Sequence, residues 1–156
     1  MHTPKHPIAD EVSLVELIAI IEKSHHNFTR IEIERINVIL KDDHLETLPS
    51  LEKIIRCFTK LKDDLETHLL KEERILFPYI SQLERNPSVP QYSCFGSIEN
   101  PIRKMQLEHI VVIGLLEELR EITLQYCPLN GSNKTIVDLY EALAGLDSDL
   151  IKHIHL

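Results

Sequence analysis

His68 and Glu72 lie four positions apart in the stretch THLLKEERILFPYI, which otherwise has the pattern of an amphipathic helix. At helical spacing both fall on an apolar row that consists of Leu51, Ile54, Phe58, Leu61, Leu65, Ile75, Leu76 and Tyr79. A carboxylate that faces an apolar core costs roughly several kcal/mol unless a positive charge or hydrogen-bond donors meet it there. Residues four apart share one helical face, so this imidazole and this carboxylate could bind one metal site.

Two further histidines occupy the same kind of position. His109 lies on the apolar row of the segment 102–119, and His153 follows Leu150 on the apolar row of the last segment. A single histidine in such a row is most often a core side chain bonded to a neighbour. Histidines that converge from several helices, together with a carboxylate, are instead the donor set of a carboxylate-bridged metal pair.

The first apolar segment offers two adjacent candidates, His25 and His26. Strict helical spacing from Leu14, Ile18 and Ile21 predicts that His25 faces the core. The periodicity therefore favours His25, although either imidazole is close to the required position.

Four long helices are expected to carry these residues, over about 10–41, 49–85, 100–126 and from 133 onwards. Asn100 and Pro101 suit the cap and first position of the third helix, and Pro78 should kink the second. The first and third connections are short, whereas 86–98 is one long loop. The chain is therefore predicted to be all-α, an up-down-up-down four-helix bundle.

Ligands of one site must also lie at one level of the bundle. A helix rises about 1.5 Å per residue, and depth can be counted from the end that holds the first and third turns. By this count, depths of roughly 22 to 30 Å are expected for His26, His68, His109 and His153. The four imidazoles can therefore meet. Imidazole with carboxylate suits iron, manganese or zinc, and Glu72 would bridge the two ions.

Composition limits the classes of function. The chain has 156 residues, 43% of them apolar, which favours one domain over 1–156 with residues 1–9 flexible. Its formal charge is −8 and its basic residues are scattered among acids, which argues against binding to nucleic acid or an anionic membrane. The mixed charges indicate neither a partner surface nor an oligomeric state. No signal peptide or transmembrane pattern is present, so a cytoplasmic location is expected. The cysteines, without a CxxC pair, are expected to be inert thiols.

The motifs SHHNFTR, LETHLLKEERILFPYI, MQLEHI and DLIKHIHL resemble, in order and spacing, the haemerythrin-like domain of the repair of iron centres (RIC) family. The resemblance runs from about Leu14 to the last residue. It implies a non-haem di-iron centre in a four-helix bundle and a role in restoring iron-sulfur clusters damaged by nitric oxide or oxidative stress.

Carried over to this chain, the resemblance implies that Glu72 bridges the two irons and that their other ligands are His26, His44, His68, His109 and His153. It thus selects His26 over His25. It also adds His44, which spacing places in the turn after the first helix, roughly 25 Å from the expected site.

The chain departs from the family pattern in two places. The family's second bridging carboxylate would be residue 157, beyond Leu156. Three explanations are open: a truncated sequence, an incomplete centre with one bridge or one weakly held metal, or a terminal carboxylate of Leu156 that substitutes. The family's small N-terminal domain with its cysteine motif is also missing.

Three functions are considered. The first is an iron-handling protein, rather than a turnover enzyme, that donates iron to damaged iron-sulfur proteins as clients. The second is a haemerythrin-type module that binds or senses O₂ or NO, or reduces NO, at the same site. The third is a metal-free bundle in which the histidines and Glu72 form a buried polar network.

Overall fold

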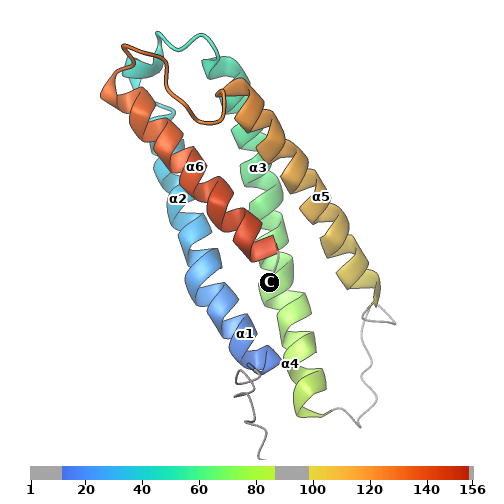
Figure 1. Cartoon of the computed structure of the whole chain (residues 1–156). Helices are drawn as coiled ribbons and strands as arrows, with labels where there is room; N and C mark the ends of the chain where they lie inside the picture. Colours follow the sequence, from blue (N-terminus) through green and yellow to red (C-terminus); the bar gives the residue numbers. More distant parts are fainter. Residues whose placement is uncertain (1–11, 87–98, 155–156) are drawn as a thin grey trace, which may run out of the picture.

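The computed structural model describes residues 12–86 and 99–154, and these form an up-down-up-down bundle of four helical rods (Figure 1). All regular elements in these ranges are helical, which confirms the predicted all-α class. No helix in the same ranges is long and apolar enough to cross a lipid bilayer. The loop expected at 86–98, apart from Asn86, and residues 1–9, which were expected to be flexible, lie outside the described part of the chain.

The first rod consists of α1 (Leu14–Ile20), the π-helical turn η1 (Ile21–His26) and α2 (Asn27–Ile39). Ser13 caps α1, since its side chain accepts the Glu16 N–H while the Glu16 carboxylate accepts the Ser13 N–H. Glu84 of the second rod accepts two further N–H groups from the first turn of α1. A carboxylate at a helix N-terminus is electrostatically favourable, so Glu84 ties the two rods together at this end.

The second rod consists of α3 (Leu51–Lys71), the π-helical turn η3 (Glu72–Leu76) and α4 (Phe77–Arg85), and a short 3₁₀ turn, η2 (Asp43–Leu45), precedes it. Pro78 lies at the start of α4. A proline ring clashes with the carbonyl one α-helical turn before it, and the wider π turn separates these groups. The predicted disturbance at Pro78 therefore takes the form of a π turn.

The remaining rods are α5 (Glu99–Ile122) and α6 (Lys134–Ile154). Two expected bounds of α5 are wrong, because Asn100 lies inside the helix rather than at its cap, and the helix ends at Ile122 rather than near Tyr126. It ends early because Leu124, Gln125 and Tyr126 all have positive φ, in the left-handed region that interrupts a right-handed helix.

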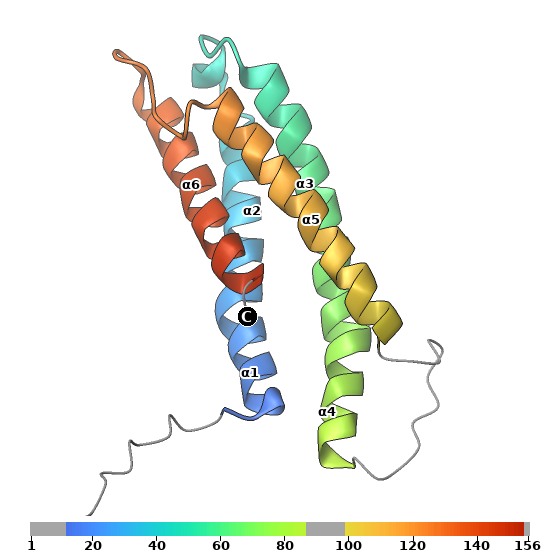
Figure 2. The same ribbon diagram turned by 45° about the vertical axis from the view of Figure 1, so that its right-hand side comes forward.

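The aliphatic core fills the end of the bundle that holds the η2 turn and the α5–α6 connection (Figure 2). Its least exposed side chains are Phe58, Ile36, Leu45, Ile54, Leu61, Leu116, Leu119, Leu139, Leu143, Leu146 and Leu150. Toward the other end of the bundle the core turns polar, with buried His26, His68, Glu72 and His153. The apolar packing thus holds four rods in register around a polar layer.

Candidate metal centre

The polar layer receives one or two side chains from every rod. His26 ends η1, His68 lies in the last turn of α3, and Glu72 opens η3. His109 comes from α5 and His153 from the last turn of α6. The antiparallel rods therefore bring five predicted site residues to one level, as the helical rise requires.

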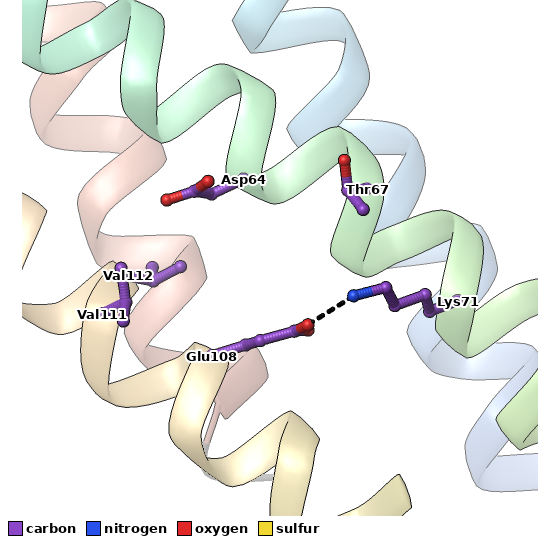
Figure 3. A pocket seen from close by; sticks show the side chains of 6 residues that line it. All are labelled: Asp64, Thr67, Lys71, Glu108, Val111 and Val112. Carbon is purple, nitrogen blue, oxygen red and sulfur yellow. Dashed lines mark hydrogen bonds and ion pairs between the residues drawn. The ribbon is translucent and has the colours of Figure 1, made fainter.

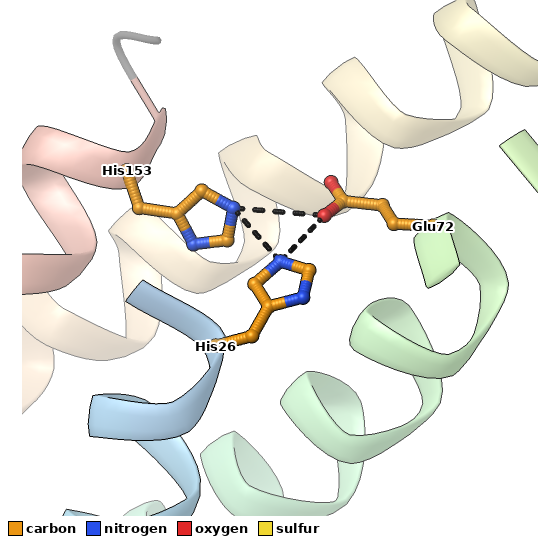
Figure 4. A group of neighbouring side chains, drawn as sticks. All are labelled: His26, Glu72 and His153. Carbon is orange, nitrogen blue, oxygen red and sulfur yellow. Dashed lines mark hydrogen bonds and ion pairs between the residues drawn. The ribbon is translucent and has the colours of Figure 1, made fainter. Parts of the chain in front are cut away.

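One carboxylate oxygen of Glu72 faces two of the histidines (Figure 4). Its Oε2 lies 3.0 Å from Nε2 of His26 and 3.5 Å from Nε2 of His153. The two Nε2 atoms lie 3.3 Å apart. These three donor atoms form a buried group that could hold a metal ion.

The other oxygen of Glu72 faces a second pair. Oε1 lies 2.7 Å from Nε2 of His68 and 3.8 Å from Nε2 of His109, and the two nitrogens lie 3.1 Å apart. These atoms form the second group that could hold an ion. Glu72 thus belongs to both groups through different oxygens, which is the geometry of a bridging carboxylate.

The donor spacing fits metal coordination. With bonds of about 2.1 Å, two donors on one ion lie about 3.0 to 3.4 Å apart at octahedral or tetrahedral angles. Most donor pairs in both groups fall close to this range. Two imidazoles and one carboxylate oxygen per ion suit iron, manganese or zinc, so the residues present fit the metal pair that the sequence predicts.

Comparison with known proteins agrees with this geometry. The profile of the family described as "Hemerythrin HHE cation binding domain" matches residues 16–156. The chain belongs to the haemerythrin HHE family. The match begins at Glu16, inside α1, continues through α6, and includes all five residues of the polar layer.

Several curated relatives of this haemerythrin-like chain carry the name "Iron-sulfur cluster repair protein YtfE". The protein from Edwardsiella ictaluri is 29% identical over 149 residues, which cover 94% of this chain and 63% of the relative. That from Pectobacterium atrosepticum is 28% identical with the same coverage. That from Yersinia pseudotuberculosis is 30% identical over 133 residues, 74% of this chain and 56% of the relative. The chain therefore spans less than two thirds of these relatives.

Electrostatic interactions in this haemerythrin-like centre keep the buried carboxylate of Glu72 ionised. Burial by itself would raise the pKa of Glu72, but hydrogen bonds from His109, His153, His26 and His68 outweigh burial and hold its pKa well below the ordinary range. The surrounding imidazoles therefore solve the desolvation problem that a buried carboxylate poses. A metal pair would supply the same compensation more strongly.

The two π turns explain which side chains face the centre. In η1 the N–H of Asn27 bonds the carbonyl five residues back, at Glu22, so one extra residue is accommodated in that turn. The inward row that passes Ile21 therefore continues at His26. The structure thus places His26 in the polar layer, instead of the His25 that strict periodicity predicts. His26 is fully buried, whereas His25 bonds Asp149 outside both groups.

The same effect corrects the second rod. In η3 the N–H of Phe77 bonds the carbonyl of Glu72, five residues back. Ile75, expected on the inward row, is 44% exposed, whereas Leu76 and Phe77 are buried. The Phe77 ring stacks on His26, with ring centroids 5.8 Å apart. Apart from Pro78, the sequence carries no signal for either π turn.

Acidic residues outside the layer orient two of the histidines. Nδ1 of His26 donates to Glu73 at 2.9 Å, and both carboxylate oxygens of Glu73 also accept bonds from Arg30. A carboxylate on Nδ1 fixes the tautomer and turns the Nε2 lone pair toward a metal. Glu73 was not among the predicted site residues, although its position next to Glu72 indicates that it could contact a ligand of the same site.

His68 has an equivalent partner on α5. Its Nδ1 donates to Glu108 at 2.6 Å, and Glu108 also accepts a bond from Lys71. Glu108 and Lys71 line a cavity of about 220 Å³ together with Asp64 and Thr67 (Figure 3). Polar side chains and solvent thus reach the outer side of Glu108, while His68 itself stays buried.

His44 is the one predicted ligand that the structure does not bring to the layer. It lies exposed in η2, where its Nδ1 bonds Asp42, and neither donor group contains it. The thirteen residues of α2 separate η2 from His26, a helical length of about 20 Å. The first rod has no break that would fold this turn back toward Glu72, so the family-based expectation for His44 lacks geometric support.

An apolar pocket of about 380 Å³ reaches the polar layer from the opposite side to η2. Its walls include Ile18, Phe77 and Met105, and Glu72, His109 and His153 lie at its inner limit. A small uncharged molecule could therefore approach the centre without crossing a charged surface.

Proposed function

We propose that this chain is an iron-handling domain that holds two ferrous ions on Glu72 and four histidines and donates iron to damaged iron-sulfur clusters. The observation that carries the proposal is the bridging geometry, in which each oxygen of one buried carboxylate faces a different histidine pair. The printed names of the relatives favour iron-sulfur clusters as the destination of the metal.

The residues of the chain perform distinct tasks in this proposal. Glu72 joins the two positions, and the four histidines supply neutral nitrogen donors. Glu73 and Glu108 hold His26 and His68 in the binding tautomer. When bound, the iron pair is the cargo that repair requires. With three protein donor atoms at each position, the ions keep open coordination sites, which favours exchange over permanent retention.

Transfer of iron to a damaged enzyme tests this function. A [4Fe-4S] enzyme inactivated by nitric oxide is incubated anaerobically with the iron-loaded protein while a chelator captures free ferrous iron. We expect recovery of its activity and a matching loss of iron from the bundle. Glu72→Gln, loaded under the same conditions, should not restore activity. Equal recovery with the metal-free protein would contradict iron donation.

A second candidate rests on the apolar pocket. O₂ and NO are small and uncharged, and the pocket leads to His109, His153 and Glu72. Reversible binding of NO would give an absorption change that disappears on degassing while the iron content stays constant. Loss of iron on exposure to NO would instead favour donation. Formation of N₂O in the headspace under reducing conditions would identify turnover at the same centre.

A further inference from the structure

Three buried polar side-chain atoms have no hydrogen-bond partner among the described residues: Thr29 Oγ1, Asp149 Oδ2 and His153 Nδ1. Buried polar atoms are nearly always paired, so each unpaired atom requires an explanation. Two of these residues are on α6, and the third is on α2, which packs against α6. The unpaired atoms therefore belong to one interface between two rods.

The register of this interface brings the three residues to neighbouring levels. His26 meets His153 at 3.3 Å, and His25 meets Asp149 at 3.0 Å. Because α2 and α6 run in opposite directions (Figure 1), one turn forward on α2 corresponds to one turn back on α6. Thr29 is one turn after His26, and Asp149 is one turn before His153, so Thr29 lies near the level of Asp149.

The orientation of His153 gives the interface a role. Its Nε2 faces Glu72 and His26, so its Nδ1 is on the far side of the ring (Figure 4). The other two fully buried imidazoles of the layer, those of His26 and His68, each donate from Nδ1 to a carboxylate. His153 is also buried but lacks such a partner. Asp149, with its unpaired carboxylate oxygen, is four residues before His153 and therefore lies on the same helical face.

We propose that Asp149 is the positioning residue of His153. Its Oδ2 is linked to the Nδ1–H of His153 through one water molecule that the Thr29 hydroxyl also binds. His25 holds the carboxylate from the other side through Oδ1, and its ring stacks on His153 with centroids 5.7 Å apart. The pair fixes His153 in the tautomer whose Nε2 can bind a metal.

This inference rests on the proposed metal pair and adds a residue that controls one of its two positions. Loss of an outer carboxylate typically weakens metal binding by about 10- to 100-fold. The effect should be confined to the ion at His26 and His153, because Asp149 has no contact with the His68 and His109 group. The second ion serves as an internal reference.

The test uses three variants of the full chain. Asp149→Asn removes the charge at nearly constant volume, and Thr29→Val removes only the hydroxyl. Glu141→Gln makes the same charge change at an exposed site on α6 and serves as the control. Each protein is titrated with Zn²⁺, and the Nδ1–H proton resonance of His153 is recorded by NMR in the zinc-loaded state.

We expect wild type and Glu141→Gln to bind two ions. In Asp149→Asn one ion should bind about 10- to 100-fold more weakly, and the His153 Nδ1–H resonance should move upfield as the charged acceptor is lost. Thr29→Val should weaken the same ion by less. A purely structural role of Asp149 would lower thermal stability without moving this resonance.

Two unchanged affinities together with an unchanged resonance in Asp149→Asn would overturn the role of Asp149 while the metal pair stands. If Asp149→Asn does not fold, Thr29→Val decides: weakened binding of one ion supports the inference, and unchanged binding of both overturns it. Failure of the wild type to bind a pair of ions would refute the proposed function, and this inference with it.

Discussion

His68 Nε2 lies 2.7 Å from Glu72 Oε1, while the second oxygen of the same carboxylate is directed to a different histidine pair. One side chain therefore connects two donor groups that come from all four rods. In the proposed metal pair, both positions would therefore depend on Glu72.

Glu72→Gln should abolish the paired centre. An amide can offer only one oxygen, and it places an N–H₂ donor where the second ion needs an acceptor. Loss of an outer partner typically weakens metal binding by roughly 10- to 100-fold. We expect a larger loss of affinity than this for both ions in Glu72→Gln. Elemental analysis after anaerobic loading with iron measures this. Glu52→Gln, an exposed change on α3, is the control, and two irons per chain in Glu72→Gln would contradict the bridge.

Alanine variants should rank three histidines that the sequence analysis left unresolved. His26→Ala removes a donor atom and should eliminate tight binding of one ion. His25→Ala should have a smaller effect, because His25 acts on the site through Asp149 and by stacking on His153 and belongs to neither donor group. His44→Ala should leave both ions in place, because His44 is exposed in η2. Isothermal titration with Co²⁺ measures all three, and a metal loss in His44→Ala equal to that in His26→Ala would refute this ranking.

Acid should release the two ions at different pH values. Burial lowers the pKa of His68, but bonds to Glu72 and Glu108 outweigh it and raise that pKa above its ordinary value of 6.5. Burial holds the pKa of His153 below 6.5. A raised pKa means that the proton competes with metal up to a higher pH, so as pH falls the ion at His68 and His109 should leave first.

The absorption of the cobalt-loaded protein, followed from pH 8 downward, should therefore show two steps. His109→Ala should remove the step at higher pH and leave the other. Removal of the lower step instead would reverse the assignment. In the metal-free protein the same shift of His68 contributes stability that is complete below pH 6.5 and is lost as pH rises through its folded pKa.

Asp147→Asn should destabilise the fold without affecting the metals. Buried Asp147 accepts two bonds from Arg120 and one from Tyr126, and it belongs to neither donor group of the polar layer. Removing its charge leaves these donors poorly matched, at a cost of about 2 to 3 kcal/mol. Urea unfolding of the metal-free protein measures the loss. Tyr126→Phe should cost less stability. Loss of iron binding in Asp147→Asn would contradict the expectation that the Asp147 cluster and the metal site are independent.

Helical periodicity alone determines much of this architecture. The apolar rows around Leu61, Leu116 and Leu143 predict four helices, and the rise per residue predicts that His26, His68, His109 and His153 share one level. Both predictions were correct because they depend on local backbone geometry and on the burial of apolar side chains. The buried position of Glu72 followed from the same row.

Tertiary structure decided which atoms face one another. The π turns at η1 and η3 add a residue per turn, which replaces His25 by His26 and turns Ile75 outward. Such turns depend on packing between rods as well as on Pro78, so a fixed α-helical period cannot reveal them. Contacts between rods also selected Glu73 and Glu108 as histidine partners, because these pairings depend on distance in space rather than spacing along the chain.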